Sequence, residues 1–283
     1  MTVSRTGEAG RGDALRSRRP RRLLLALLGE FVMQDWSAPV RTGVFLEVLQ
    51  QAGVAAPAAR ANLDRLVANG VLSRARHGRH LEFSVTPAGR KLIGEASERV
   101  RGPAPFLPNG DGWTLVTFSL PEELRTLRSR LRSTLTWHGF APLRDGLWLA
   151  SGRPALAAAL EPLSDELPPG AVMAFRAQEL DGFPIAASVR DAWDIEGIRD
   201  AHQAFIDDWS DRGSDAASAV ATRTMLVADW LTLLRADPRL PPEYLDDRWP
   251  AATSFALYRS IRDALTERSE SEFAELVGAS LSS

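Results

Sequence analysis

Six charged residues stand close together in types and spacings that suit contact with phosphates and base edges. They are Arg60, Asp64 and Arg65 in one segment, followed by Arg74, Arg76 and Arg79 in the next. An arginine can donate two hydrogen bonds to guanine or pair with a phosphate, and an aspartate can accept a hydrogen bond from the amino group of cytosine. These side chains are therefore candidates for recognition of double-stranded DNA.

The segment around Arg60 is predicted to be a helix that presents these charges outward. Pro57 suits the first turn of a helix, and Gly70 suits its left-handed cap. Between them, apolar residues repeat at helical spacing, so one face is expected to be buried. The expected inner face holds Ala59, Leu63, Leu66 and Val67, and the outer face holds Arg60, Ala61, Asp64, Arg65 and Ala68.

The elements around this helix are predicted to form a winged helix-turn-helix. Two amphipathic helices are expected before it, over 20–33 and 40–51, and two strands after it, over 71–76 and 80–85. A basic hairpin that follows such a helix is typical of a wing that contacts the DNA backbone or minor groove. The alternative is an interaction module of three helices and a hairpin that does not bind DNA.

Charge divides the chain unevenly, although its net charge is −2. Residues 1–101 hold 17 Lys or Arg and 9 Asp or Glu, a net charge of +8, whereas residues 102–283 carry −10. A basic module attracts phosphates and releases their counterions, while an acidic body is repelled by the same polyanion. Basic surfaces are also often merely solvated, so charge alone leaves both interpretations open.

Residues 113–180 follow the order β-α-β-β-α-β, which predicts a ferredoxin-like middle domain. Arg125, Arg128 and Arg132 share one face of its first helix, which is expected over 121–137, and they are candidate effector-binding residues. They either bind the phosphates of a nucleotide-like ligand, bind the DNA backbone, or form a solvated face. Its second helix is expected over 154–167.

The whole chain is expected to have an α+β fold. Residues 1–19 are predicted to be a disordered basic arm, 20–101 the winged helix-turn-helix domain, 113–180 the middle domain and 190–283 a C-terminal helical domain. Thr86 is expected to cap a helix that follows the hairpin. Most tryptophans lie in the later part of the chain, where they form either core or the walls of a pocket for a flat ligand.

The residue inventory predicts no catalytic, metal or cofactor site. The chain has no cysteine, and its four histidines lack the spacing of a zinc site. A metal-dependent nuclease with such a middle domain would need an acidic residue at the end of its first strand, and 113–121 contains none. The lack of cysteine and of a long apolar run predicts a cytoplasmic protein that does not contact membranes.

Three stretches resemble the PaaX-type repressors of phenylacetic acid catabolism. They are 58–70 in the expected recognition helix, Trp137 to Phe140 with Gly146 to Trp148, and Leu234 to Pro241 with Trp249 and Pro250. The resemblance implies a winged N-terminal domain, a middle domain shaped like the small CRISPR-associated endonuclease and a helical C-terminal domain. It also implies a homodimer that binds a palindromic operator and is released by an aryl-acyl-coenzyme A thioester.

Two segments depart from the pattern of this family. Ala61 and Asp64 stand where relatives often carry hydroxyl residues, so a different operator sequence is expected. Val227 to Trp230 replaces a segment that often holds histidine and arginine, so the effector is not carried over. The expected function is a ligand-responsive transcriptional repressor. The alternatives are an enzyme that cleaves nucleic acid with its middle domain and an architectural DNA-binding protein without an effector.

Overall fold

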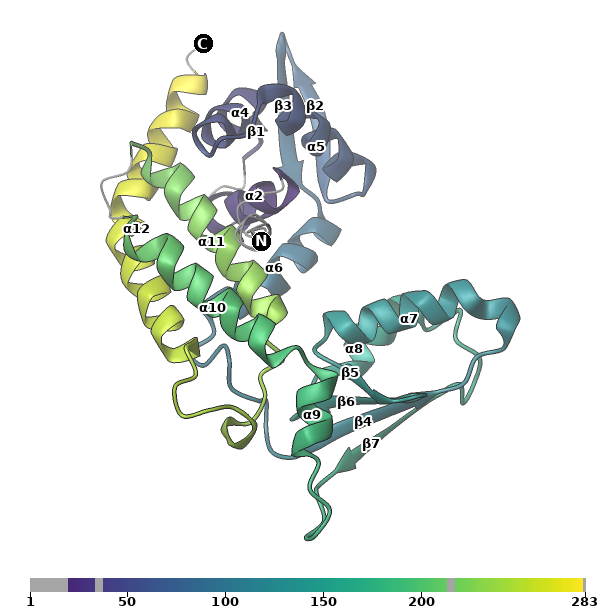
Figure 1. Ribbon diagram of the computed structural model, residues 1–283. Coiled ribbons are helices and arrows are strands. Elements are labelled where there is room, and N and C mark those ends of the chain that lie inside the picture. The colour runs from purple at the N-terminus through teal and green to yellow at the C-terminus, as the bar shows by residue number, and fades with distance from the viewer. Residues whose placement is uncertain (1–19, 34–37, 213–216, 282–283) are drawn as a thin grey trace, which may run out of the picture. The chain divides into compact units, whose positions relative to one another are not determined.

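The computed structural model describes residues 20–33, 38–212 and 217–281 (Figure 1). The expected arm, residues 1–19, lies outside the described residues. Helices predominate, and two small antiparallel sheets hold the strands, so the expected α+β class is confirmed.

The chain forms two compact units. Unit 1 comprises the N-terminal residues up to Pro103 together with 202–233 and the segment from Ala252 onward, and unit 2 comprises 104–201 and 234–251. The helices α10 (Ile195–Ser210) and α11 (Ala219–Ala236) each contribute residues to both units. The domain boundaries given above remain predictions.

The N-terminal part of unit 1 has the helices and the hairpin in the order expected from the sequence, together with a short strand at Val40–Arg41, where the second helix was expected to begin. Its helices are α2 (Pro20–Leu27), α4 (Thr42–Gln51), α5 (Ala56–Ala68) and α6 (Pro87–Arg101), and its strands are β1 (Val40–Arg41), β2 (Leu72–His77) and β3 (His80–Val85). The strands pair in the order β1-β3-β2. Three of the four expected inner residues of α5 are buried, because Ala59, Leu63 and Leu66 are each at most 1% exposed, whereas Val67 is half-buried. Helix α5 therefore packs its apolar stripe inward.

One detail of the first helix differs from the sequence prediction. After α2, residues Leu28–Val32 form a π-helical turn, η1, in place of a regular α-helix over 20–33. Glu30 lies in this turn and is buried. Hydrophobic periodicity carries no signal for a π-helical turn, and such turns often occur at functional positions.

Helix α6 begins where the sequence indicates. The Thr86 side chain accepts a hydrogen bond from the backbone N–H of Gly89 at 3.0 Å, which confirms the expected cap. The same hydroxyl donates to the carbonyl of Val71 at 3.2 Å. A Cβ added at Gly89 would lie 2.2 Å from that carbonyl oxygen, so only glycine allows α6 to approach the start of β2 this closely.

Three helices complete unit 1, namely most of α10, most of α11 and α12 (Ala251–Leu281). Their large aromatic side chains form core: Trp230 stacks on Tyr258 with ring centroids 4.3 Å apart and contacts Phe205 at 5.5 Å. Trp209 and Trp230 are at most 1% exposed. In this unit, the interpretation of the tryptophans as core is thus the correct one.

Unit 2 contains a ferredoxin-like domain with all neighbouring strands antiparallel. Its strands are β4 (Trp113–Phe118), β5 (Ala141–Arg144), β6 (Leu147–Ser151) and β7 (Val172–Ala177), in the sheet order β5-β6-β4-β7. Helix α7 (Arg125–Trp137) and the short α8 (Leu156–Leu160) pack on one face through Val116, Leu131 and Trp148. The expected second helix is shorter than predicted, because a 3-10 turn follows at Glu161–Leu163.

The other face of the sheet is covered by a second apolar cluster. Helix α9 (Ala186–Ala192) contributes Val189, and the following chain contributes Trp193. The ring of Trp113 in β4 packs against the rings of Trp193 and Tyr244, with centroids 6.4 and 5.2 Å away. Tyr244 belongs to the 3-10 turn Pro242–Tyr244. Residues 234–251 therefore belong to the core of unit 2.

Candidate functional site

The outward face of α5 carries the charges that the sequence analysis singled out. Arg60, Asp64 and Arg65 are exposed, together with Ala61 and Ala68. Asn62 was not predicted to lie on the inner face, but it is 8% exposed and donates a hydrogen bond from its side chain to the carbonyl of Ala58 at 2.8 Å. It is a polar residue that turns inward within its own helix.

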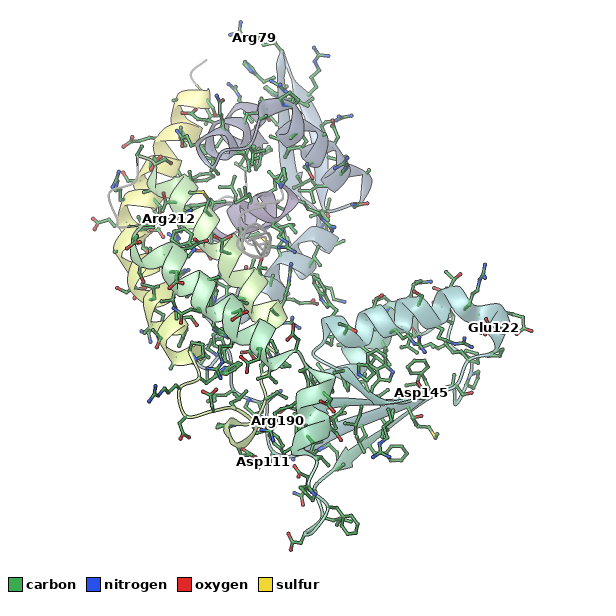
Figure 2. The ribbon with its side chains drawn as sticks, viewed as in Figure 1. Arg79, Asp111, Glu122, Asp145, Arg190 and Arg212 are labelled. Carbon is green, nitrogen blue, oxygen red and sulfur yellow. The ribbon has the colours of Figure 1, made fainter. Side chains whose placement is uncertain are left out.

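The hairpin β2–β3 carries the remaining three arginines. Its strands pair in a regular register from Leu72 opposite Val85 to His77 opposite His80, with Gly78 at φ +59° in the turn. Arg74 and Arg76 alternate with Ala75 along β2, so both lie on one face of the strand, and both are exposed. Arg79 occupies the tip of the hairpin (Figure 2).

An ion pair joins the helix to the hairpin. The Arg74 guanidinium donates to the Asp64 carboxylate at 2.9 Å, and the two side chains are 47% and 59% exposed. An exposed pair of this kind contributes about 0.2–1 kcal/mol. In the free protein, Asp64 therefore neutralises part of the charge of Arg74.

His80 stands beside the tip of the hairpin. The Arg79 side chain donates to Nε2 of His80 at 3.2 Å. Partial burial lowers the pKa of His80 below its ordinary value, and the positive charges of Arg41, Arg79 and His77 lower it further, whereas Glu82 opposes them. His80 thus favours its neutral form more than an isolated histidine does.

Arg41 of β1 contacts both the hairpin and the C-terminal helix of unit 1. Arg41 donates to the carboxylate of Glu82 on β3 at 3.4 Å and to the backbone carbonyl of Ser280 near the end of α12. A positive charge near the C-terminal end of a helix is favourable, because unpaired carbonyls there carry partial negative charge. Arg41 therefore ties the hairpin to α12.

A buried ion cluster also links the N-terminal helices to α11 and α12. Glu30 accepts hydrogen bonds from Arg223 at 2.8 and 2.9 Å and from Arg262 at 3.0 Å, and the side chains of Glu30 and Arg223 are each 2% exposed. Arg223 also reaches Glu270 at 3.2 Å. Burial, and to a lesser degree Glu30, raises the pKa of Tyr258 above its ordinary value, so its phenol stays protonated.

The three arginines expected to bind an effector have different surroundings in unit 2. The Arg128 guanidinium donates hydrogen bonds to the Glu122 carboxylate, at 2.9 Å, and to the backbone carbonyl of Leu120. Arg132 is exposed and lines a groove of about 440 Å³ along α7, whereas Arg125 is exposed but does not line it. The spacing of i, i+3 and i+7 thus does not give the three guanidinium groups one role.

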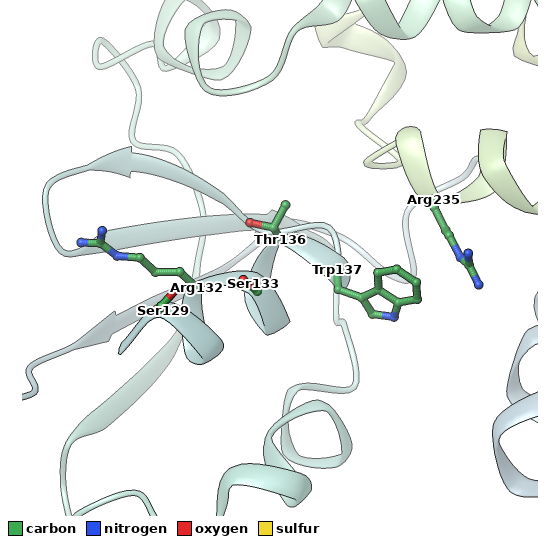
Figure 3. A pocket seen from close by; sticks show the side chains of 6 residues that line it. All are labelled: Ser129, Arg132, Ser133, Thr136, Trp137 and Arg235. Atoms are coloured by element: carbon green, nitrogen blue, oxygen red, sulfur yellow. The ribbon is translucent and has the colours of Figure 1, made fainter. Parts of the chain in front are cut away.

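The groove combines hydroxyl, basic and aromatic side chains (Figure 3). It is lined by Ser129, Arg132, Ser133, Thr136, Trp137 and Arg235. The Arg235 guanidinium lies 4.4 Å from the centre of the Trp137 ring, and Trp137 is 53% exposed. A neighbouring groove of about 350 Å³ shares Thr136 and Arg235 and is lined further by Trp193. Such a surface suits a ligand with an anionic group and a flat ring.

The described residues contain no group of three metal-ligating side chains. A histidine beside a serine can also form a catalytic pair, and Nδ1 of His202 lies 2.8 Å from Oγ of Ser254. Both residues are fully buried, so no substrate can reach them.

Within the described ranges, no helix is both long and apolar enough to cross a membrane.

These elements define a class of protein in which a module with a basic helix and hairpin is joined to a ferredoxin-like domain and to further helices. Family models assign the chain more closely. Residues 19–89 match the model of the PaaX-like protein, 108–184 that of the PaaX protein central Cas2-like domain, and 193–275 that of the PaaX-like protein C-terminal domain. The chain belongs to the PaaX family, as the three resembling stretches predicted. Membership places it among transcriptional regulators.

Solved structures extend the likeness of the fold. The uncharacterized protein Rv0674 from Mycobacterium tuberculosis is similar over 90% of this chain and 99% of its own, with 22% sequence identity and a TM-score of 0.59. That likeness concerns the fold alone. A search of curated proteins found no match to this chain.

Proposed function

We propose that the chain is a DNA-binding transcriptional repressor in the cytoplasm, acting on genes of phenylacetate-like catabolism. The observation that carries the proposal is the exposed basic surface that runs from Arg60 and Arg65 on α5 to Arg76 and Arg79 on the hairpin. An α-helix fits the major groove, and a hairpin beside it can follow the backbone. Membership of a family of transcriptional regulators supports the same function.

Each part of this surface has a role in the proposal. Arg60 and Arg65 donate to base edges or to the phosphates that flank them, while Arg76 and Arg79 contact the backbone. On binding, Asp64 exchanges Arg74 for a donor on the DNA, such as the amino group of cytosine, and Arg74 turns to a phosphate. Two copies would read a palindrome, because a dimer presents two such surfaces related by a two-fold axis.

Replacing Arg60 and Arg65 with alanine tests the proposed interface. The variant should bind DNA from upstream of its own gene more weakly, by about 1–3 kcal/mol for each arginine that pairs with a base edge. The matched control is Arg259→Ala, which removes an exposed arginine of α12, away from α5 and the hairpin. Equal affinity of the wild type and the double variant would refute the proposal.

The same proposal includes release from DNA by an aryl-acyl-coenzyme A thioester. The groove along α7 supports it, because Arg132 and Arg235 offer positive charge to phosphates and the exposed ring of Trp137 offers a stacking surface to an aryl group. The ligand would act by binding one conformation of the dimer more tightly than the conformation that fits the operator.

A thermal-shift screen of coenzyme A thioesters tests this part. Phenylacetyl-coenzyme A or a relative should raise the melting temperature of the wild type, because a ligand that binds only the folded state stabilises it. Arg132→Ala and Trp137→Ala should reduce that shift, whereas Arg125→Ala, outside the groove, should leave it unchanged. If no thioester stabilises the wild type, the chain acts without this effector. The proposal assigns no catalysis to the chain, so DNA incubated with it and Mg²⁺ should remain intact.

A further inference from the structure

The distal half of the β2–β3 hairpin extends beyond the third strand of its sheet. Strand β1 pairs with β3 at only two positions, and the pair nearer the tip is Arg41 with Glu82. Between Glu82 and the tip, β3 pairs only with β2 among the described strands, and this distal half carries Arg76 and Arg79. A two-stranded hairpin is only marginally stable by itself, so the contacts at its base must determine its direction.

Arg41 lies at the point where this distal half begins. Because it is opposite Glu82 in the register, the two side chains lie on the same face of the sheet. The Arg41 guanidinium donates to the Glu82 carboxylate at 3.4 Å and to the backbone carbonyl of Ser280, at the end of α12 that lies beside β1 (Figure 1). The planar guanidinium holds its acceptors in fixed directions. Arg41 therefore links the base of the distal half to the last turn of α12.

The end of α12 is itself held within unit 1. Phe273, which is 1% exposed, stacks on Phe31 of η1 with ring centroids 5.1 Å apart. The Glu272 carboxylate accepts hydrogen bonds at 2.7 and 3.2 Å from the backbone N–H groups of the first two residues of α11. A carboxylate is favourable at the start of a helix, because the N–H groups there carry partial positive charge. The carbonyl of Ser280 is thus a fixed acceptor for Arg41.

Two further observations place Arg41 close to the distal half. The hydroxyl of its neighbour Thr42 donates to the carbonyl of Leu81 at 2.9 Å, one residue beyond Glu82 towards the tip. Partial burial and, after it, the positive charge of Arg41 lower the pKa of His80, which is the first residue of β3. The chain at 41–42 therefore supports the hairpin at the level where β1 ends.

Arg41 itself offers little surface to a ligand. Its side chain is 14% exposed, and its guanidinium already binds two acceptors of unit 1. Arg76 and Arg79 on the distal half are exposed instead. An influence of Arg41 on a ligand of the hairpin must therefore act through the position of the hairpin.

We propose that Arg41 is a positioning residue, which anchors the distal half of the hairpin to the last turn of α12 and so directs Arg76 and Arg79 towards the DNA backbone. The inference rests on the proposed function in one respect, since it takes DNA to be the ligand of these two arginines. It adds that the last turn of α12, about 200 residues further along the chain, supports the surface that contacts DNA.

Hydrogen exchange followed by mass spectrometry tests the anchoring without DNA. In Arg41→Ala, the backbone amides of 76–81 should exchange several-fold faster, while those of α2 and α5 keep their rates. Arg41→Lys keeps the charge but not the planar fork, so its rates should be intermediate. The matched control is Arg22→Ala: Arg22 is also half-buried and joins α2 to α11 through the Thr232 hydroxyl at 3.1 Å, away from the hairpin. Unchanged exchange in Arg41→Ala, or equal acceleration in Arg22→Ala, would overturn the proposal.

A double-mutant cycle distinguishes positioning from direct contact with DNA. Arg41→Ala should weaken binding to the DNA upstream of its own gene by roughly three- to thirtyfold, within the range of couplings between neighbouring residues. In a chain that already carries Arg76→Ala and Arg79→Ala, the same substitution should change the affinity by less than about twofold, because no arginine remains to be positioned. An equal loss of affinity in both chains would mean that Arg41 binds DNA itself or only stabilises the fold, and would contradict the proposal.

The two measurements together separate this inference from the proposed function. If exchange at 76–81 accelerates in Arg41→Ala but the wild type binds no DNA, the anchoring by Arg41 stands and the proposed function fails. If the wild type binds DNA through Arg60 and Arg65 and Arg41→Ala binds it equally well, the positioning role is wrong and the proposed function stands.

Discussion

Asp64 is the one acidic side chain of the outward face of α5, and its pairing with Arg74 could not be predicted from sequence. Helical spacing predicted correctly that Arg60 and Arg65 are exposed, because the apolar stripe of a helix determines its other face. The ion pair depends instead on how the hairpin lies against the helix, which no local pattern encodes. Arg128 is a similar case. Helical spacing placed it on one face with Arg125 and Arg132, but its guanidinium binds Glu122 and a backbone carbonyl instead of facing a ligand groove.

Asp64→Asn should strengthen binding to DNA of unrelated sequence. The substitution removes a carboxylate that repels phosphates and frees Arg74, so affinity should rise about two- to fivefold, in line with the small energy of an exposed ion pair. Fluorescence anisotropy with a random duplex measures it. Glu267→Gln, on the exposed side of α12, removes the same charge elsewhere and should have little effect. Weaker binding by Asp64→Asn would mean that the pair positions Arg74 for DNA.

His80 should make DNA binding depend on pH. Its pKa is lowered in the free protein, and a nearby phosphate would raise it, so the complex takes up a proton. Affinity should therefore increase as pH falls from 8 towards 6 and level off below the pKa of the free protein. His80→Gln should flatten this profile, whereas His138→Gln in unit 2 should not. An unchanged profile in His80→Gln would exclude contact between His80 and the backbone.

At the scale of elements, the buried ion cluster that joins η1 to α11 and α12 could not be predicted from the sequence. Glu30 interrupts an apolar helix, and its partners Arg223 and Arg262 lie far along the chain. A helical C-terminal region was predictable, because buried residues recur at helical spacing along α10. The charges that join its helices to η1 were not, since a buried ion pair leaves no periodic signal.

Glu30→Gln should destabilise unit 1 by about 3–5 kcal/mol, because it leaves Arg223 buried without its main counter-charge. Chemical denaturation followed by tryptophan fluorescence measures the change. Glu270→Gln is the matched control: Glu270 also contacts Arg223 but is 50% exposed, so its loss should cost less than about 1 kcal/mol. Equal effects of the two substitutions would show that the cluster is weaker than its burial implies.

Gly89→Ala should destabilise the junction between α6 and β2 by about 1–3 kcal/mol, since the new methyl group would lie 2.2 Å from the carbonyl oxygen of Val71. Gly94 lies in the same helix with open space around its Cα, so Gly94→Ala should be neutral or stabilise the helix by up to about 1 kcal/mol. Thermal unfolding of both variants measures the difference. The explanation fails if Gly89→Ala is as stable as Gly94→Ala.

At the scale of the whole molecule, the order of the parts could be predicted but their grouping could not. The β-α-β-β-α-β order of residues 113–180 predicted the sheet topology of the ferredoxin-like domain correctly. Residues 202–233 and 252–281 instead join the compact unit of the N-terminal helices, and 234–251 join the sheet domain. Such grouping depends on contacts between distant residues, such as Arg41 with Ser280 and Glu30 with Arg223.

Footprinting of the wild-type protein on the DNA upstream of its own gene tests the central claim most directly. A repressor that reads DNA with α5 and the β2–β3 hairpin should protect one discrete site with two-fold symmetry. The centres of its half-sites should lie about one helical turn, or a multiple of it, apart. Arg60→Ala with Arg65→Ala should abolish that protection. Uniform protection without a discrete site, or an unchanged footprint with the double variant, would contradict the account.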